Sequence, residues 1–274
     1  MHKTRSGSIL VILIISILTI TSSCKYQKLL KSDDYELKLE TAIKYFEKER
    51  YSRSISLLNS VLPVYRGTQK AETVNYYFAM AHYKQGDYVY ASHLFVTFHQ
   101  TFPRSEHAEE FFFLSAYCKY LLSPNTGRDQ TPTLEAIQQF QRFINRYPQS
   151  AKVEEANNLI DELRLKLEKK AFDMAMMYYR IKNYNAAATS FKTLIVDFPD
   201  IKYREEAMFY AADSYFKFAE NSIFEKQQER YELAVDAYNK FIRAYPESKF
   251  KQQADEIYRR SSSKLKEIKL SQTN

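Results

Sequence analysis

One spacing recurs four times along the chain and limits the fold more than any other feature of the sequence. In each copy an alanine is followed by an aromatic residue four positions later and by a proline twelve positions later. Because proline lacks an N–H group and clashes with the preceding turn, each proline predicts the end of a helix. The alanine lets two helices approach closely, and the ring one turn later fills the gap between them. The copies are Ala91, Phe95 and Pro103; Ala136, Phe140 and Pro148; Ala187, Phe191 and Pro199; and Ala234, Tyr238 and Pro246.

Acidic pairs mark the helices that follow three of these copies. Acids in the first turn of a helix complement its dipole, so each pair predicts a helix start. A less regular first copy carries Ser54 at the alanine position and a shifted proline, Pro63, as terminal repeats often do. The acidic pairs are Glu109-Glu110, Glu154-Glu155 and Glu205-Glu206.

The pattern resembles the tetratricopeptide repeat (TPR), a helix–turn–helix unit of about 34 residues. The resemblance implies an all-α fold, a TPR α-solenoid of about five repeats over residues 33–268, with residues 269–274 as a C-terminal tail. The chain has only four glycines and seven prolines in 274 residues, which also favours helices. Each hairpin leaves an apolar face that only stacking on a neighbour can bury, so several repeats are needed.

Two copies are longer than the others. Residues 123–132 contain Ser, Pro, Asn, Thr and Gly, which predicts an inserted loop, and residues 221–228 predict a similar extension. Residues 152–181 contain no helix breaker, so we expect one helix of about 30 residues that ends one repeat and opens the next. Asp33 and Glu36 have the spacing of a capping box for the first helix.

The N-terminus has the pattern of an export signal over residues 1–23. Basic residues precede an apolar stretch of about 12 residues, against about 20 needed to cross a bilayer. Thr21-Ser22-Ser23-Cys24 resembles a lipobox, with Thr21 in place of the usual leucine. We therefore expect lipidation at Cys24, followed by a lipidated tether over residues 24–32. The alternatives are an ordinary secretory signal with a chance cysteine, or an N-terminal membrane anchor.

Charge and reactive residues argue against other classes of function. The net charge is +7, but acids and bases alternate along the chain, and no Lys/Arg block indicates nucleic acid binding. With Cys24 lipidated, Cys118 is left alone in an apolar helical run, where a buried small side chain is favoured over a reactive thiol. We find no histidine pair with metal-ligand spacing, glycine-rich phosphate loop or nucleophile elbow, so we expect no enzyme activity, metal or cofactor.

The first helix of each TPR lines the concave groove, which implies a trough rich in aromatic side chains. Tyrosine offers a large contact area at low entropy cost, so this trough suits an extended apolar peptide or a partner helix. The alternative is that these rings pack between repeats. Lys84 and Lys119 could hold a lone carboxylate or be solvated. Cochaperone TPRs clamp a dicarboxylate with Lys and Asn, but the corresponding first-repeat residues here are Leu39 and Ile43. The expected binding rings are Tyr76, Tyr83, Phe113, Tyr117 and Tyr120, and further expected groove positions are Phe46, Met80, Phe172, Met176, Tyr179, Phe209 and Phe216.

A lipidated cysteine followed closely by five TPRs resembles the BamD family of β-barrel assembly machinery lipoproteins. The stretch Cys24–Ser32 is similar to the mature start of its members in Bacteroidota, and the inserted loop and long helix match the family's layout. The resemblance implies a lipid anchor in the outer membrane, facing the periplasm. It also implies binding of a barrel-forming BamA-like protein, other assembly subunits and the C-terminal signals of unfolded outer membrane proteins. The C-terminal repeats would dock the barrel-forming component and the N-terminal repeats would receive substrates.

Two other functions share parts of this pattern. One is a periplasmic TPR lipoprotein that coordinates envelope constriction or cell-wall synthesis. The other is a glycan-binding lipoprotein of the SusD type, although those chains are longer and the absence of Trp here removes the favoured sugar-stacking residue.

Overall fold

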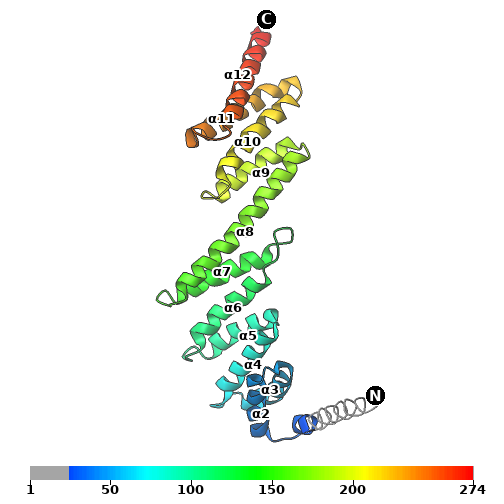
Figure 1. The fold of residues 1–274 in the computed structure, drawn as a ribbon, viewed down its shortest axis with the longest axis vertical. Helices are drawn as coiled ribbons and strands as arrows, with labels where there is room; N and C mark the ends of the chain where they lie inside the picture. Colours follow the sequence, from blue (N-terminus) through cyan, green and yellow to red (C-terminus); the bar gives the residue numbers. More distant parts are fainter. Residues whose placement is uncertain (1–24, 274) are drawn as a thin grey trace, which may run out of the picture. The chain divides into compact units, whose positions relative to one another are not determined.

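The computed structural model describes residues 25–273, and every regular element in this part of the chain is an α-helix (Figure 1). The expected signal peptide and Cys24 lie outside the described residues. The chain divides into two compact units. Unit 1 contains the described residues up to Ser123 together with Thr131–Ile160, and unit 2 contains Pro124–Gln130 together with the residues from Asp161 onward.

Each unit is a stack of helix hairpins joined by short loops, and successive helices pack against each other. Unit 1 holds α2 (Tyr35–Glu47), α3 (Tyr51–Tyr65), α4 (Ala71–Gln85), α5 (Tyr88–Thr101), α6 (Ala108–Leu122), α7 (Thr131–Arg146) and the start of α8 (Val153–Arg180). Unit 2 holds the rest of α8, α9 (Tyr184–Asp197), α10 (Arg204–Glu220), α11 (Phe224–Ala244) and α12 (Lys251–Thr273). Among the described residues, five helix pairs (α2 with α3, α4 with α5, α6 with α7, α8 with α9 and α10 with α11) make five repeats, and α12 packs on the last one. The prediction of an all-α TPR solenoid is therefore confirmed.

The recurring residues occupy the positions that their spacing predicts. The four alanines of the pattern are fully buried, and so are the rings of Phe95, Phe140 and Phe191. Helices α5, α9 and α11 end at Thr101, Asp197 and Ala244, two residues before the proline in each case. The repeated spacing thus encodes both the close approach of the helices and the place where the second one stops.

The first repeat differs from the others at two positions, Ser54 and Pro63. Ser54 is buried at the alanine position, and its hydroxyl donates a hydrogen bond to the carbonyl of Ala42 at 2.8 Å, which satisfies the extra polar atom. Pro63 lies inside the last turn of α3, which continues to Tyr65. The interpretation of Pro63 as the shifted stop of this helix was therefore wrong.

One expected insertion is confirmed and the other is not. Residues 123–130 form a loop, and α7 begins at Thr131, so Pro132 stands in its first turn, where no N–H donor is needed. Near the second site only residues 221–223 lie outside helices, so the extra residues lengthen α10 and α11 instead. The long helix is confirmed, since α8 runs unbroken for 28 residues.

The start of the described chain differs from the expected tether. Residues 25–30 are helical, and Tyr26, Leu29 and Leu30 pack against the apolar core of α2, α3 and α4. The cap of α2 is also one residue later than expected. The side chain of Asp34, and not that of Asp33, accepts the N–H of Leu37 at 2.9 Å.

A serine two residues after the proline ties together three of the hairpins. Ser150, which follows α7, donates a hydrogen bond to the carboxylate of Glu109 in the first turn of α6 at 2.5 Å. The same hydroxyl accepts the backbone N–H of Lys152 at 3.1 Å. Each serine therefore connects the end of a hairpin to its beginning. The equivalent pairs are Ser105 with Glu72 and Ser248 with Glu205.

We expect Ser150→Ala to lower the free energy of unfolding by about 1–2 kcal/mol, because a half-buried, charge-assisted hydrogen bond and a turn contact are lost together. Urea denaturation at neutral pH measures this. Ser56→Ala, at an exposed position of α3, is the matched control, because its hydroxyl bonds only to the carbonyl of Ser52 four residues earlier. We expect that control to change stability by less than about 0.5 kcal/mol. Equal effects of the two variants would argue against the tie.

Candidate functional site

Unit 2 contains a groove of about 710 Å³ between α8, α10 and α12. These are the first helices of the last two repeats and the final helix. Its floor is aromatic and its walls carry charged and amide side chains. The lining residues are Tyr179, Phe209, Tyr210, Asp213, Phe216, Lys217, Glu220, Gln252, Gln253, Glu256, Ile257 and Arg260.

A charged network of three side chains lies in this groove. The ammonium of Lys217 is 2.8 Å from the carboxylate of Asp213, whose side chain is only 12% exposed. The hydroxyl of Tyr179 donates to the same carboxylate oxygen and accepts a hydrogen bond from Lys217. Burial raises the pKa of Tyr179 to about 12, and the bond to Asp213 acts in the same direction. Burial alone would lower the pKa of Lys217, but its hydrogen bonds to Asp213 and Tyr179 raise it. Tyr179 therefore stays protonated and Lys217 stays charged at neutral pH.

The remaining walls of the groove combine a second ion pair with uncharged amides. Arg260 bonds to Glu220 and lies 4.7 Å from the centre of the Phe216 ring. Gln252 and Gln253 are exposed at the start of α12. An amide side chain both donates and accepts hydrogen bonds, so this wall can pair with the backbone of an extended peptide.

Asp213 and Lys217 were not predicted from the sequence as site residues. An acid and a lysine four residues apart on a helix usually form an exposed pair. The usable signal was the position of Asp213 between Phe209 and Phe216, since these three residues share one face of α10 at helical spacing. Gln252 and Gln253 carried no comparable signal.

In unit 1 the expected tyrosines lie on α4 and α6 and remain partly exposed. Tyr76 stacks on Phe111 with ring centres 5.3 Å apart. Tyr117 stacks on Tyr120 at 5.5 Å. Burial raises the pKa of Tyr83 on α4 to about 12, and Cys118 and Tyr117 of α6 contribute to the shift. We call these four partly exposed tyrosines of α4 and α6 the tyrosine face.

Phe113 does not belong to the exposed part of this face. It is only 2% exposed and contacts the rings of Phe140 and Phe143 on α7, with centres 5.7 and 5.4 Å away. The alternative of packing between helices therefore describes Phe113. It also describes three of the other expected groove positions, since Leu39, Phe209 and Phe216 are 4–5% exposed.

The two candidate lysines lie in different settings. The ammonium of Lys119 is 2.6 Å from the carboxylate of Glu135 on α7, and Lys119 lines a separate cleft of about 780 Å³ between α5, α6 and α7. It stands two residues from Tyr117 on the same helix, which directs the two side chains to different faces. Lys84 is exposed near the end of α4 and has no ion-pair partner among the described residues. Of the two, Lys84 remains available for a carboxylate.

Among residues 25–273, no group of three or more His, Cys, Asp and Glu side chains is arranged to hold a metal ion. Cys118 is fully buried, and this burial raises the pKa of its thiol to about 12. None of the described helices combines the length and the apolar character that crossing a bilayer requires.

Comparisons with known proteins place this geometry in context. The family model YfiO, described as an outer membrane lipoprotein, matches residues 33–231. A putative outer membrane protein assembly factor BamD from Aquifex aeolicus (strain VF5) is 24% identical over 163 residues, which cover 60% of this chain and 51% of the relative. The chain therefore matches about half the length of that curated relative.

Two solved structures are similar at low identity. The TPR2AB domain of yeast Sti1 in its pHSP90 complex has 14% identity and a TM-score of 0.38, with 87% of this chain and 93% of that chain covered. A tetratricopeptide repeat protein from Parabacteroides merdae ATCC 43184 has 14% identity and a TM-score of 0.38, with 89% of this chain and 100% of that chain covered.

Proposed function

This chain belongs to the YfiO family of outer membrane lipoproteins, and from that premise we propose that it is a protein-binding scaffold of the machinery that assembles β-barrel proteins in the outer membrane. The groove of unit 2 is the observation that carries the proposal. It combines aromatic side chains, paired charges and amide side chains on adjacent helices, which suits the binding of a protein segment. Its ionisable groups are held in ion pairs and hydrogen bonds, so we propose a binding role and not a catalytic one.

The two units have different proposed partners. The mixed charges of the unit 2 groove suit a folded domain of the barrel-forming, BamA-like component, because paired charges fix the register of an interface. The tyrosine face of unit 1 suits the C-terminal signal of an unfolded barrel protein, and Lys84 could meet its terminal carboxylate. A lipid on Cys24 would hold the chain at the periplasmic face of the outer membrane. Release of the chain from envelopes by salt alone would argue against that anchor.

Crosslinking in whole cells, followed by mass spectrometry of the partners, tests the scaffold role. A photoreactive residue at Gln253, on the wall of the groove, should capture the barrel-forming component. Capture of wall-synthesis or Tol-type proteins in its place would favour the alternative role in envelope constriction. A matched photoreactive residue at Ser56, on an exposed part of α3, should capture neither.

The tyrosine face can be tested separately with a peptide from the C-terminus of a barrel protein. We expect the double variant Tyr76→Ala, Tyr83→Ala to bind this peptide about tenfold or more weakly, because two large amphipathic contact surfaces are removed. Fluorescence anisotropy measures the affinity. Lys119→Ala is the control, since Lys119 lines the other cleft, and it should leave the affinity unchanged. Phe113 is left intact because its loss would disturb the core. Unchanged affinity in a correctly folded double variant would refute this assignment.

A further inference from the structure

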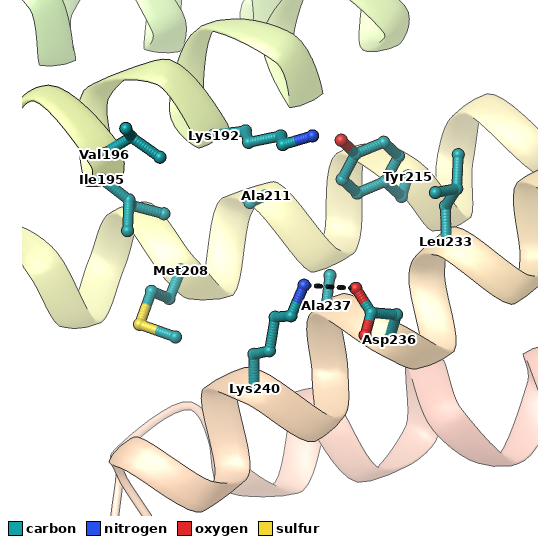
Figure 2. Close-up of a pocket in the computed structure, with 10 residues that line it drawn as sticks. All are labelled: Lys192, Ile195, Val196, Met208, Ala211, Tyr215, Leu233, Asp236, Ala237 and Lys240. Carbon is teal, nitrogen blue, oxygen red and sulfur yellow. Dashed lines mark hydrogen bonds and ion pairs between the residues drawn. The ribbon is translucent and has the colours of Figure 1, made fainter.

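A second pocket lies on the face of α10 opposite to the groove. Figure 2 shows the residues that line this pocket. It has a volume of about 220 Å³ and is formed by α9, α10 and α11. Met208, Ala211 and Tyr215 of α10 face this pocket, whereas Phe209, Asp213 and Phe216 face the groove. One helix thus supplies two separate surfaces, and the proposed function uses only the groove.

The same place in unit 1 is also hollow. The cleft between α5, α6 and α7 is the equivalent of the pocket. Each of the two hollows lies between the second helix of one repeat and both helices of the next repeat. When Ala91 is aligned with Ala187 and Ala136 with Ala234, the lining positions coincide. The matched pairs are Val96 with Lys192, His99 with Ile195, Gln100 with Val196, Phe112 with Met208, Lys119 with Tyr215, Glu135 with Leu233, Gln139 with Ala237 and Arg142 with Lys240.

The two hollows differ in chemistry although the repeat makes both. In unit 1 the lining mixes apolar side chains with polar and charged ones, and Lys119 pairs with Glu135. In unit 2 the positions of Gln100 and Glu135 are taken by Val196 and Leu233, which are 70% and 41% exposed. Covering such exposed apolar side chains with a partner is favourable, because it removes apolar surface from water. At these two positions the pocket is therefore apolar where its equivalent in unit 1 is polar.

The charges at the pocket select the kind of partner. Lys240 is neutralised by Asp236, with 2.6 Å between ammonium and carboxylate. Lys192 extends over the opposite rim toward the hydroxyl of Tyr215 (Figure 2). In the part of the chain that the structure describes, Lys192 has no ion-pair partner. The rim thus carries one uncompensated positive charge beside an apolar cavity.

We propose that the pocket between α9, α10 and α11 docks a partner-protein segment that inserts one large apolar side chain and places an acidic residue next to Lys192. The volume is below the roughly 300–1,000 Å³ of pockets that take drug-sized molecules, but it suits a single anchoring side chain. The apolar side chain would cover Val196 and Leu233, and the acid would pair with Lys192.

Methyl NMR of the full chain in detergent, labelled with ¹³C at the methionine methyl groups, tests the proposal. Met208 lines the pocket, whereas Met80, Met174, Met176 and Met177 lie elsewhere and report on the fold. The test peptides are Ac-Gly-Phe-Asp-Gly-NH₂, a version with Lys in place of Asp, and a version with Ala in place of Phe. We expect the first to shift the Met208 signal in a saturable way. The Lys version should bind about fivefold more weakly and the Ala version more than about tenfold more weakly.

Two variants separate the proposed contact from a general effect of charge. Lys192→Glu should reverse the preference between the Asp and Lys peptides. Arg142→Glu, in the equivalent cleft of unit 1, should leave that preference as it is. The proposal is overturned if the Met208 signal does not respond to the Phe-Asp peptide, if the Asp and Lys peptides bind equally, or if Lys192→Glu changes nothing. Unchanged signals of the other methionines establish that each variant is folded.

Discussion

Replacement of Phe191 with alanine is expected to lower the free energy of unfolding by about 3–5 kcal/mol. Phe191 is fully buried in unit 2, and its ring lies 6.0 Å from that of Phe172 on α8 and 5.9 Å from that of Tyr210 on α10. Its removal therefore leaves a cavity where three helices meet, in addition to the lost burial of the ring itself. Urea denaturation followed by circular dichroism at 222 nm measures the change.

The control for this variant lies on the same helix. Val196 is 70% exposed, so Val196→Ala should change the free energy of unfolding by less than about 0.5 kcal/mol. Both substitutions shorten a side chain to alanine on α9, so the difference between them reports burial and not helix propensity. A loss below about 1 kcal/mol for Phe191→Ala would contradict the role of the repeated ring as the packing unit of the fold.

Phe191 also shows why much of the fold could be predicted from the sequence. Ala187, Phe191 and Pro199 act within one hairpin. Their spacing alone is enough to predict the close helix contact, the buried ring and the end of the helix. The same local logic predicted α8, since a stretch without Gly or Pro continues as a helix once it has begun. Helix ends and helix contacts that depend on residues of a single repeat can therefore be predicted from one sequence.

Two predictions about the ends of helices were wrong, at residues 221–228 and at Pro63. The sequence around residues 221–228 was expected to form a loop by comparison with repeat length alone, yet its Glu, Lys and Gln residues favour helix and α11 begins at Phe224. Pro63 was expected to end α3, but a proline removes only its own N–H bond and disturbs the preceding turn, and the helix continues for two further residues to Tyr65. In both places the local helix continues where repeat length or a proline predicted a break.

The candidate site was harder to predict because it depends on which neighbour covers each ring. Phe113 and Tyr117 are both aromatic and lie one turn apart on α6, so spacing alone treats them alike. Packing of α7 buries Phe113 against Phe140, whereas Tyr117 stays partly exposed. Likewise the network of Tyr179 and Asp213 joins residues of different helices, and no pattern within either helix specifies the meeting.

The second large effect is expected at alkaline pH and arises from Cys118. Its thiol is fully buried, and burial raises its pKa from the ordinary 9.0 to about 12. Above pH 9 the unfolded chain loses this proton while the folded chain keeps it, so the unfolded state binds fewer protons and stability falls as the pH rises. The contribution is fully present below pH 9. Above pH 9 the free energy of unfolding should fall by about 1.4 kcal/mol per pH unit, and the total loss should reach about 4 kcal/mol near pH 12.

Comparison of the wild type with Cys118→Ala isolates this contribution, because the tyrosines that also ionise in this range are shared by both proteins. The substitution shifts stability at every pH through the lost side-chain volume, so the informative quantity is the slope of the free energy of unfolding against pH. Urea titrations under reducing conditions at pH 8, 9, 10 and 11 should give a steeper fall for the wild type, with a difference of about 2–3 kcal/mol between pH 9 and 11. Parallel slopes would mean that the thiol ionises equally in both states, which a fully buried position between α4, α5 and α6 does not permit.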